Sequence, residues 1–306
     1  MKSASGAVQL EECDVVGIRS RAFLTEPAPD PTFRFISDLA RELSSGRLEL
    51  PSFPDAAARV QHVLSDPAVT NERIARVIGA DAGLAARVLT MSNSALLHRG
   101  STPLTDLKVA VTRIGHDHIR TAALAYANAQ LRQAPELAHI RPQLEACWRD
   151  AIRVASLAHS IAKETGSART DEAMLTGLLH NIGKVYIIAR APRHPGSAPA
   201  LDAAVVENWY ASIGQAVAQN WKLPEEIAGA IAGQLELERT HEGPADLLDL
   251  LIVAVQVAAK MAARAPDDAA LAQLPAAAAL GLSAPTFKRI ALDAHAEIQT
   301  LQAALG

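Results

Sequence analysis

The stretch Leu178–Lys184 reads Leu-Leu-His-Asn-Ile-Gly-Lys and lies in a run of apolar residues at helical spacing. His180 offers a neutral nitrogen ligand, and an acidic neighbour at position 181 would add an anionic oxygen able to bridge two metals. Asn181 has the shape of an aspartate without its charge, and a neutral amide is a poor ligand for a pair of transition metals. The stretch therefore resembles a metal motif that has lost its carboxylate.

The rest of the chain carries the same helical pattern. Apolar residues recur at helical spacing nearly everywhere, and alanine is abundant, which favours helices over strands. Thr105 before Asp106, and Pro224 before two glutamates, are typical of helix starts. Three stripes illustrate the pattern: Val60, Val63 and Leu64; Ile74, Val77 and Ile78; Leu84, Val88 and Met91. We therefore predict an all-α fold.

Several motifs occur in a fixed order around this stretch. They are Leu50-Pro51-Ser52-Phe53-Pro54, Asp66-Pro67, Asp81, Ser92-Asn93-Ser94-Ala95, and Ala110, Val111, Ile114 and Gly115. Their order over roughly residues 48–260 resembles the HDOD family, a branch of the HD superfamily of metal-dependent phosphohydrolases.

The resemblance implies an HDOD-type helical fold in two parts. An N-terminal helical subdomain, residues 33–140, is expected to pack on a degenerate HD-like helical subdomain, residues 141–306. Residues 1–32 are expected to be an N-terminal extension that is partly extended or disordered. Exposed breaks are expected near residues 192–199, 241–244 and 266–268.

The resemblance also implies where an active HD enzyme would hold its metals. Asp150 falls at a position where that pattern has a histidine, and Ala259 at the position of its last aspartate. Residues 209–214, with Tyr210, and residues 230–234, with Gln234, lack the histidines of catalytic relatives; Gln256 belongs to the same degenerate set. Of the ligand set only His180 remains, so we predict no catalytic residue and no metal.

Two interpretations of His180 stay open. It could bind a metal with Asp150, although one histidine and one carboxylate are fewer than the three or four ligands of a stable site. The preferred interpretation is a half-buried imidazole that is hydrogen-bonded to Asp150 or to a backbone carbonyl. Asn181 is expected to hydrogen-bond a neighbouring helix. The vacated site would then be a pocket for a ligand or partner, lined by Asp150, His180, Asn181, Lys184 and Tyr210.

Two other features have competing interpretations. Gly177 and Gly183 fall inside helical patterns, where each costs about 1 kcal/mol relative to alanine. We expect them to allow close helix approach, and the alternative is that they leave room for a small ligand. Asn93 is expected to cap its helix with its own side chain, and the alternative is a contact surface for a partner. His159 and His194 are expected to be surface or interhelical residues.

Bulk properties limit the class of function. With 29 Lys and Arg against 33 Asp and Glu, the net charge is −4, which gives no basic surface for nucleic acid or membranes. Helices expected over residues 55–97 loosely resemble a helix-turn-helix, yet Leu84–Leu97 offers little beyond Arg87 and Asn93 to read bases. Cys13 and Cys147 have no metal-type spacing, and the chain shows no apolar leader or membrane-length apolar run, so we expect a cytoplasmic protein.

We therefore expect a non-catalytic regulatory protein of bacterial signal transduction, as the resemblance implies. It would act by binding other signalling proteins, or a small molecule, without a cofactor, and its sequence is compatible with a homo-oligomer. The alternative is a metal-dependent phosphohydrolase with a rearranged site, such as a nucleotide or cyclic dinucleotide phosphodiesterase.

Overall fold

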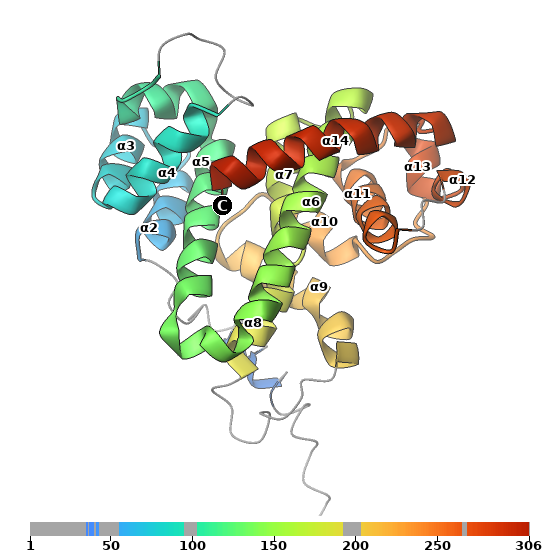
Figure 1. Ribbon diagram of the computed structural model, residues 1–306, viewed down its shortest axis with the longest axis horizontal. Coiled ribbons are helices and arrows are strands. Elements are labelled where there is room, and N and C mark those ends of the chain that lie inside the picture. Colours follow the sequence, from blue (N-terminus) through green and yellow to red (C-terminus); the bar gives the residue numbers. More distant parts are fainter. Residues whose placement is uncertain are drawn as a thin grey trace, which may run out of the picture.

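The computed structural model describes residues 35, 37–39, 41–42, 55–94, 103–191, 203–264 and 268–305. Within these ranges every regular element is a helix, which confirms the predicted all-α fold (Figure 1). In the same ranges no helix combines the length and the apolar character that crossing a membrane requires. The N-terminal extension, the Leu-Pro-x-x-Pro-like motif and the expected break at residues 192–199 lie outside the described residues.

The first helices form one core. They are α2 (Asp55–Leu64), α3 (Asn71–Gly79), α4 (Ala82–Ser92) and α5 (Leu107–Gln133). The three stripes predicted from the sequence point into this core, with only Val77 half-buried. Side-chain oxygens of Thr70, Asp81 and Asp106 accept hydrogen bonds from backbone N–H groups of the first turns of α3, α4 and α5. Local capping therefore fixes where these helices begin.

Helix α5 is broken at Gly115, as its backbone angles show. Gly115 has φ 76° and ψ 173°, a conformation that favours glycine because a Cβ would be strained there. Asn93, after α4, contacts Leu104, before α5: its amide donates to the carbonyl of Leu104 (2.8 Å) and accepts from its N–H (2.7 Å). The expectation that this side chain caps α4 was wrong, because the backbone N–H of Asn93 closes that helix while the amide bridges to Leu104.

The helices from η1 to α14 follow; most of them form a second core around α6, while η1 packs in a small third cluster with α5, α6 and α8. They are η1 (Pro135–Ile140), α6 (Arg141–Thr165), α7 (Thr170–Leu179), α8 (Ile182–Arg190), α9 (Ala203–Asn220), α10 (Glu225–Gly233), α11 (Leu247–Ala262), α12 (Asp268–Leu271), α13 (Pro275–Ala279) and α14 (Ala284–Leu305). Helix α6 packs against α7, α11 and α14. The predicted start of α10 after Pro224 and the break at residues 241–244 are both present.

The two cores share helices. Trp148, Ile152 and Leu178 belong to the first core, although they lie on α6 and α7. Helix α14 crosses both, since Phe287 packs in the second core and Leu301 in the first (Figure 1). The subdomain boundary near residue 140 stays a prediction, because α5, α6, α7 and α14 all contribute to both cores.

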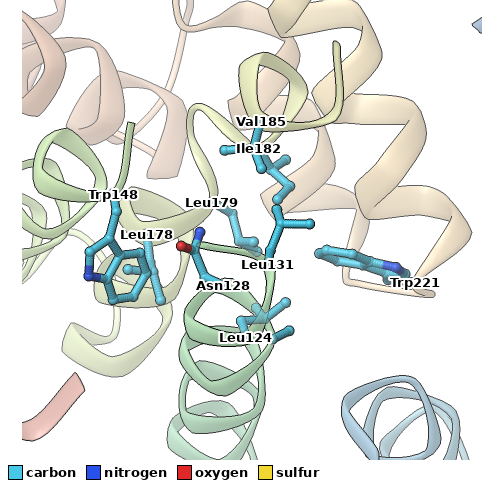
Figure 2. Close-up of a pocket in the computed structure, with 10 residues that line it drawn as sticks. Leu124, Asn128, Leu131, Trp148, Leu178, Leu179, Ile182, Val185 and Trp221 are labelled. Atoms are coloured by element: carbon cyan, nitrogen blue, oxygen red, sulfur yellow. The ribbon is translucent and has the colours of Figure 1, made fainter. Parts of the chain in front are cut away.

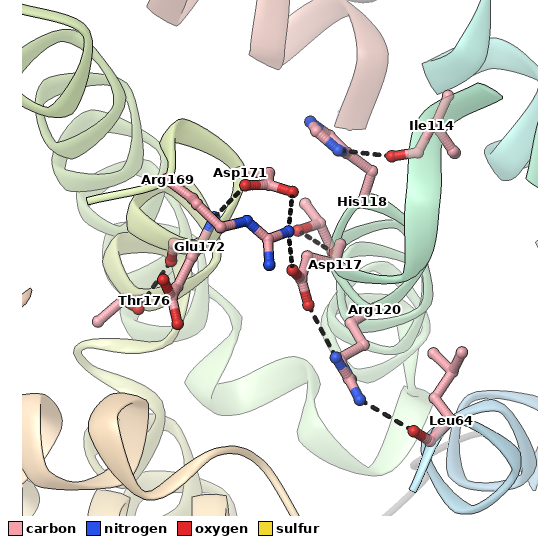
Figure 3. Close-up of polar contacts among 10 residues, drawn as sticks. Leu64, Ile114, Asp117, His118, Arg120, Arg169, Asp171, Glu172 and Thr176 are labelled. Carbon is pink, nitrogen blue, oxygen red and sulfur yellow. Dashed lines mark hydrogen bonds and ion pairs between the residues drawn. The ribbon is translucent and has the colours of Figure 1, made fainter. Parts of the chain in front are cut away.

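A polar network joins α2, α5 and α7 (Figure 3). The carboxylate of Asp117 accepts from Arg120 (2.7 Å) and from Arg169 (2.8 Å). Arg120 also donates to the carbonyl of Leu64 (3.0 Å), and Arg169 to Asp171 (2.6 Å). Two arginines thus tie the end of α2 and the start of α7 to the same turn of α5.

Candidate functional site

The His180 site lies where α7 meets α8, beside α6. His180 follows the last residue of α7, Asn181 precedes the first residue of α8, and both side chains are buried. Gly177 lies against the backbone of α6, where a Cβ would come within 2.6 Å of the Cα of Ala155. The expected role of this glycine in close helix packing is therefore seen directly, and it brings the His180 turn onto α6.

Both ring nitrogens of His180 have protein partners. Nδ1 lies 2.7 Å from the carbonyl oxygen of Gly177, and Nε2 lies 3.2 Å from Oδ2 of Asp150. A carbonyl only accepts, so Nδ1 carries the hydrogen of the first bond. With one hydrogen on Nδ1, a hydrogen bond from Nε2 to the Asp150 carboxylate requires a second ring hydrogen, as in imidazolium, whereas metal ligation would use the lone pair of Nε2. The imidazole is therefore committed to two neighbours within the chain.

Amide side chains occupy the surroundings of His180. Asn181 donates to the carbonyl of Cys147 on α6 (2.8 Å). Gln234 is completely buried after α10 and donates to the carbonyls of His180 (2.8 Å) and Ile231 (2.7 Å). Neither amide brings an anionic oxygen. They fix α6, α7 and α10 around the His180 turn.

Lys184 and Tyr210 form the next layer of the site. The Lys184 ammonium lies 4.3 Å from the centroid of the Tyr210 ring and donates to Glu207 on α9 at 2.6 Å. Burial, with the charges of Glu207 and Asp150, raises the pKa of the Tyr210 phenol. Gly183 allows this approach of α8 to α9, because a Cβ there would overlap the Tyr210 carbonyl and lie 2.7 Å from the nitrogen of Gly214.

Asp150 connects the buried and exposed parts of the site. Burial alone would raise the pKa of its carboxyl, but the hydrogen bond with His180 and the charges of Arg153 and Lys184 bring that pKa below its ordinary value. The Asp150 side chain is 41% exposed and that of Arg153 is 30% exposed, with Nη1 of Arg153 3.3 Å from the Asp150 carboxylate. The Asp150 carboxylate is thus partly exposed to solvent, next to the basic side chains of Arg153 and Lys184.

Two residues of the predicted set take no part in these contacts. On α11, Gln256 is half-buried and Ala259 is exposed. In the described part of the chain neither has a side-chain hydrogen bond or ion pair with Asp150, His180 or Asn181. His159 is interhelical as expected, with Nε2 3.2 Å from Glu297 on α14, whereas His194 lies outside the described residues.

The donor set does not fit the metal pair that the HD resemblance implies. Two metals need several histidine and carboxylate ligands converging on one point, and here one imidazole and one carboxylate bond to each other. Among the described residues, the only group of three or more His, Cys, Asp or Glu side chains with clustered donor atoms is His241, Asp246 and Asp249, at the start of α11.

Sequence reasoning missed that second cluster. Arg239 donates to Asp246 (2.6 Å) and to Asp249 (2.7 Å), and His241 Nε2 lies 2.7 Å from Asp249. The guanidinium already supplies positive charge between the carboxylates, and the two aspartates also form the capping box of α11. The three-residue spacing of Asp246 and Asp249 could have indicated the capping box. Nothing in the sequence pattern indicates that Arg239 and His241 contact this capping box.

Comparison with known proteins places the fold in a family. The sequence profile of the HDOD domain matches residues 50–237, which bears out the resemblance seen in the sequence. An uncharacterized protein of Treponema pallidum (strain Nichols) is 27% identical over 205 residues, 63% of this chain. The chain spans only 39% of the length of that curated relative.

Solved structures agree with this fold. A protein of Shewanella amazonensis SB2B, named "Putative metal-dependent phosphohydrolase", is 27% identical with a TM-score of 0.61, over 88% of this chain and 99% of that one. A "Putative signal transduction protein" of Marinobacter aquaeolei VT8 is 20% identical with a TM-score of 0.58, over 90% of this chain and 66% of that one. The second likeness concerns the fold alone.

Proposed function

Because this chain belongs to the HDOD family, we propose that it is a non-catalytic regulatory protein of bacterial signal transduction that acts by binding. One observation carries the proposal: both ring nitrogens of His180 are engaged by Gly177 and Asp150. The residue in the place of the metal-bridging aspartate, Asn181, donates its amide hydrogen to Cys147.

The chemistry of phosphate ester hydrolysis supports the same conclusion. Metal-assisted attack on phosphorus needs a metal-bound hydroxide and a shell of carboxylate and histidine ligands. Among the residues that the structure describes, Asp150 is the one carboxylate bonded to His180, and it also pairs with Arg153. Opening a coordination position would therefore require breaking contacts that hold α6 to the His180 turn.

The exposed part of the site is suited to binding. Asp150, Arg153, Lys184 and Glu207 place two carboxylates and two cations on one face, which we call the relic face. Their side chains are 41%, 30%, 23% and 58% exposed. Alternating charges of this kind give specificity and orientation to a protein partner more than bulk affinity. Because Asp150 itself bonds to His180, a partner or ligand that binds Asp150 also acts on the contact that fixes the His180 ring.

The catalytic part of the proposal is tested by metal content and hydrolysis together. The purified chain, loaded with Mn²⁺ or Fe²⁺ and desalted, should retain much less than one metal per chain. It should hydrolyse bis-p-nitrophenyl phosphate and a cyclic dinucleotide no faster than the His180→Ala variant. Stoichiometric metal with hydrolysis that disappears in His180→Ala would instead establish the phosphohydrolase alternative.

The binding part is tested by charge reversal on the relic face. Glu207→Lys should reduce the recovery of partners captured from the native cell extract, because it reverses one charge and leaves Lys184 without its carboxylate. Glu238→Lys is the matched control, since Glu238 is exposed near α11 and outside this face. Equal recovery with both variants would exclude the relic face as the binding surface.

A further inference from the structure

The junction between the two cores leaves little empty space. The cavity there has a volume of about 20 Å³, room for a single water molecule, and Figure 2 shows Trp148 and Trp221 on opposite sides of it. This cavity therefore has no space for a larger ligand. Helix α14 also joins the cores, with Phe287 packed in the second and Leu301 in the first. Between these two anchors α14 buries a polar contact against α6.

This contact is made by Glu297 of α14 and His159 of α6. Oε1 of Glu297 lies 3.2 Å from Nε2 of His159, and the two side chains are only 12% and 14% exposed. The hydroxyl of Ser160 donates to Oε2 of Glu297 over a long distance of 3.4 Å. Among the described residues, neither Oε1 of Glu297 nor Nδ1 of His159 has a hydrogen-bond partner, although both atoms are buried. The carboxyl group is thus held between two helices by one long hydrogen bond.

An ionised carboxylate is unfavourable in such surroundings. The loss of hydration on burial is offset only when hydrogen bonds and opposite charge replace the water. Burial raises the pKa of the Glu297 carboxyl, and the negative charge of Asp293 acts in the same direction. The charges of His159 and Lys163 and the hydrogen bond from Ser160 oppose this rise without cancelling it. A proton on Oε1 removes the buried charge and turns an unpaired acceptor into a donor that faces His159.

The other helices packed against α14 contribute few charges to this contact. These helices are α4, α5 and α12. Helices α4 and α12 carry one charged residue each, Arg87 and Asp268, and Figure 1 shows α4 beside the end of α14 and α12 beside its start. On α5, burial and the charge of His159 lower the pKa of His118, while the charge of Asp171 opposes this shift. His118 is therefore mostly uncharged at neutral pH.

We propose that the docking of α14 on α6 is proton-dependent, because the docked helix takes up a proton at the contact of Glu297 with His159. The helix is held more firmly in mildly acidic solution, and it loosens as the pH rises and the proton leaves. Since α14 is anchored in both cores, its loosening weakens the connection between them. None of these residues belongs to the relic face, so this inference does not depend on the proposed function.

The sign of the effect follows from the direction of the pKa shift. Glu297 is an acid whose pKa is raised in the folded chain. The stability that it contributes is therefore fully present below its ordinary pKa of about 4.5 and is lost as the pH rises through the higher, folded pKa. An ordinary surface carboxylate that forms an ion pair has the opposite dependence, because its pKa is lowered on folding.

Amide hydrogen exchange of the full chain tests the proposal. It is measured from pH 5 to pH 8 and corrected for the pH dependence of the chemical exchange step. In the wild type, the opening constant of amides near Glu297 should increase by about threefold or more over this range. The increase should not exceed about tenfold per pH unit, which is the limit for one proton. Amides at residues 252–258 of α11 report unfolding of the second core and should not change in parallel.

Three variants assign the effect to this contact. Glu297→Gln keeps the shape of the side chain without its charge, so α14 should be protected at pH 8 as well as in the wild type at pH 5. Ser160→Ala removes the hydrogen bond to the carboxylate and should increase the pH dependence, which tests the proposal even if Glu297→Gln folds poorly. Glu164→Gln is the matched control, because Glu164 pairs with Arg289 between the same helices with the two side chains 35% and 57% exposed, and it should retain the wild-type dependence.

The contrary outcomes are equally specific. An opening constant that stays level or decreases from pH 5 to pH 8 in the wild type would overturn the proposal. The same conclusion would follow if Glu297→Gln kept the wild-type pH dependence, if Ser160→Ala reduced it, or if Glu164→Gln abolished it.

Discussion

The Nε2 atom of His180 lies 3.2 Å from Oδ2 of Asp150, so the ring nitrogen that a metal would use contacts a carboxylate of the same chain. The two residues are 30 positions apart and come from α7 and α6. In an HD enzyme both positions would point their donor atoms at a cation. Here an acid and a base at those positions contact each other, and this contact joins α6 to the His180 turn.

Gly183 is expected to be essential for this arrangement, because α9 leaves no room for a side chain. Gly183→Ala would drive a Cβ into the backbone of Tyr210 and Gly214, and should cost about 3 kcal/mol or more in the free energy of unfolding. Gly229→Ala is the control, since a Cβ at that helical position meets nothing within 4 Å. It should stabilise by about 0.5–1 kcal/mol. Urea unfolding measures both, and similar effects of the two variants would refute the packing argument.

Asp150 should make the fold sensitive to acid. Its pKa is lowered in the folded chain, so its contribution to stability is present above the unfolded pKa of about 4 and is lost as pH falls through the lower, folded pKa. In Asp150→Asn the free energy of unfolding should therefore decrease less steeply as the pH falls below about 4. The effect should stay near 1 kcal/mol or below, because the side chain is 41% exposed and screened. The measurement is the urea unfolding midpoint of wild type and Asp150→Asn from pH 3 to 7, with Glu238→Gln as the control variant. If the midpoints of wild type and Asp150→Asn changed in parallel with pH, the prediction would be contradicted.

The sequence predicted most of the arrangement around His180, because the resemblance to HDOD proteins implies that the helices carrying Asp150 and His180 meet. A histidine at the end of α7 and an aspartate on α6 follow from the order of motifs, and Gly177 and Gly183 mark where helices touch. Contacts that depend on loops were not predictable. Asn93 bridges to Leu104, and Arg239 reaches Asp246 and Asp249, through chain segments whose path no periodicity encodes.

His241 should titrate above the usual range of histidine. Its hydrogen bond with Asp249, together with the backbone carbonyl of Glu242, raises the pKa of the imidazole. The stability it contributes is fully present below the unfolded pKa of about 6.5 and is lost as pH rises through the higher, folded pKa. NMR titration should show the pKa of His241 returning toward its ordinary value in Asp249→Asn. Exposed His139 is the internal reference, and an unchanged His241 titration would argue against the contact.

Cys147 should be a poor nucleophile in the folded chain. Burial raises the pKa of its thiol from 9.0 to about 11, with the charges of Asp150 and Glu207 acting in the same direction. The thiolate fraction near pH 8 should fall about a hundredfold relative to the unfolded chain, and alkylation by iodoacetamide should slow accordingly. Mass spectrometry of a Cys13→Ser variant, with and without urea, measures the ratio. Rapid labelling of the native protein would show that the thiol is accessible and ionised.

The Asp117 network should be stabilised unequally by its two arginines. Asp117 and Arg120 are each 13% exposed, whereas the side chain of Arg169 is 68% exposed. Because solvent screens the second pair, a double-mutant cycle should give about 1–2 kcal/mol of coupling for Asp117 with Arg120 and less than about 0.5 kcal/mol with Arg169. Each cycle uses alanine variants and urea unfolding, so the separate loss of the Arg120 bond to Leu64 cancels between its arms. The exposed pair Arg73 and Asp66 serves as reference and should couple as weakly as the Arg169 pair. Equal coupling energies for the two arginines would mean that burial does not determine the strength of these ion pairs. The Arg169 pair would then hold α7 to α5 as strongly as the Arg120 contacts hold α2 to α5.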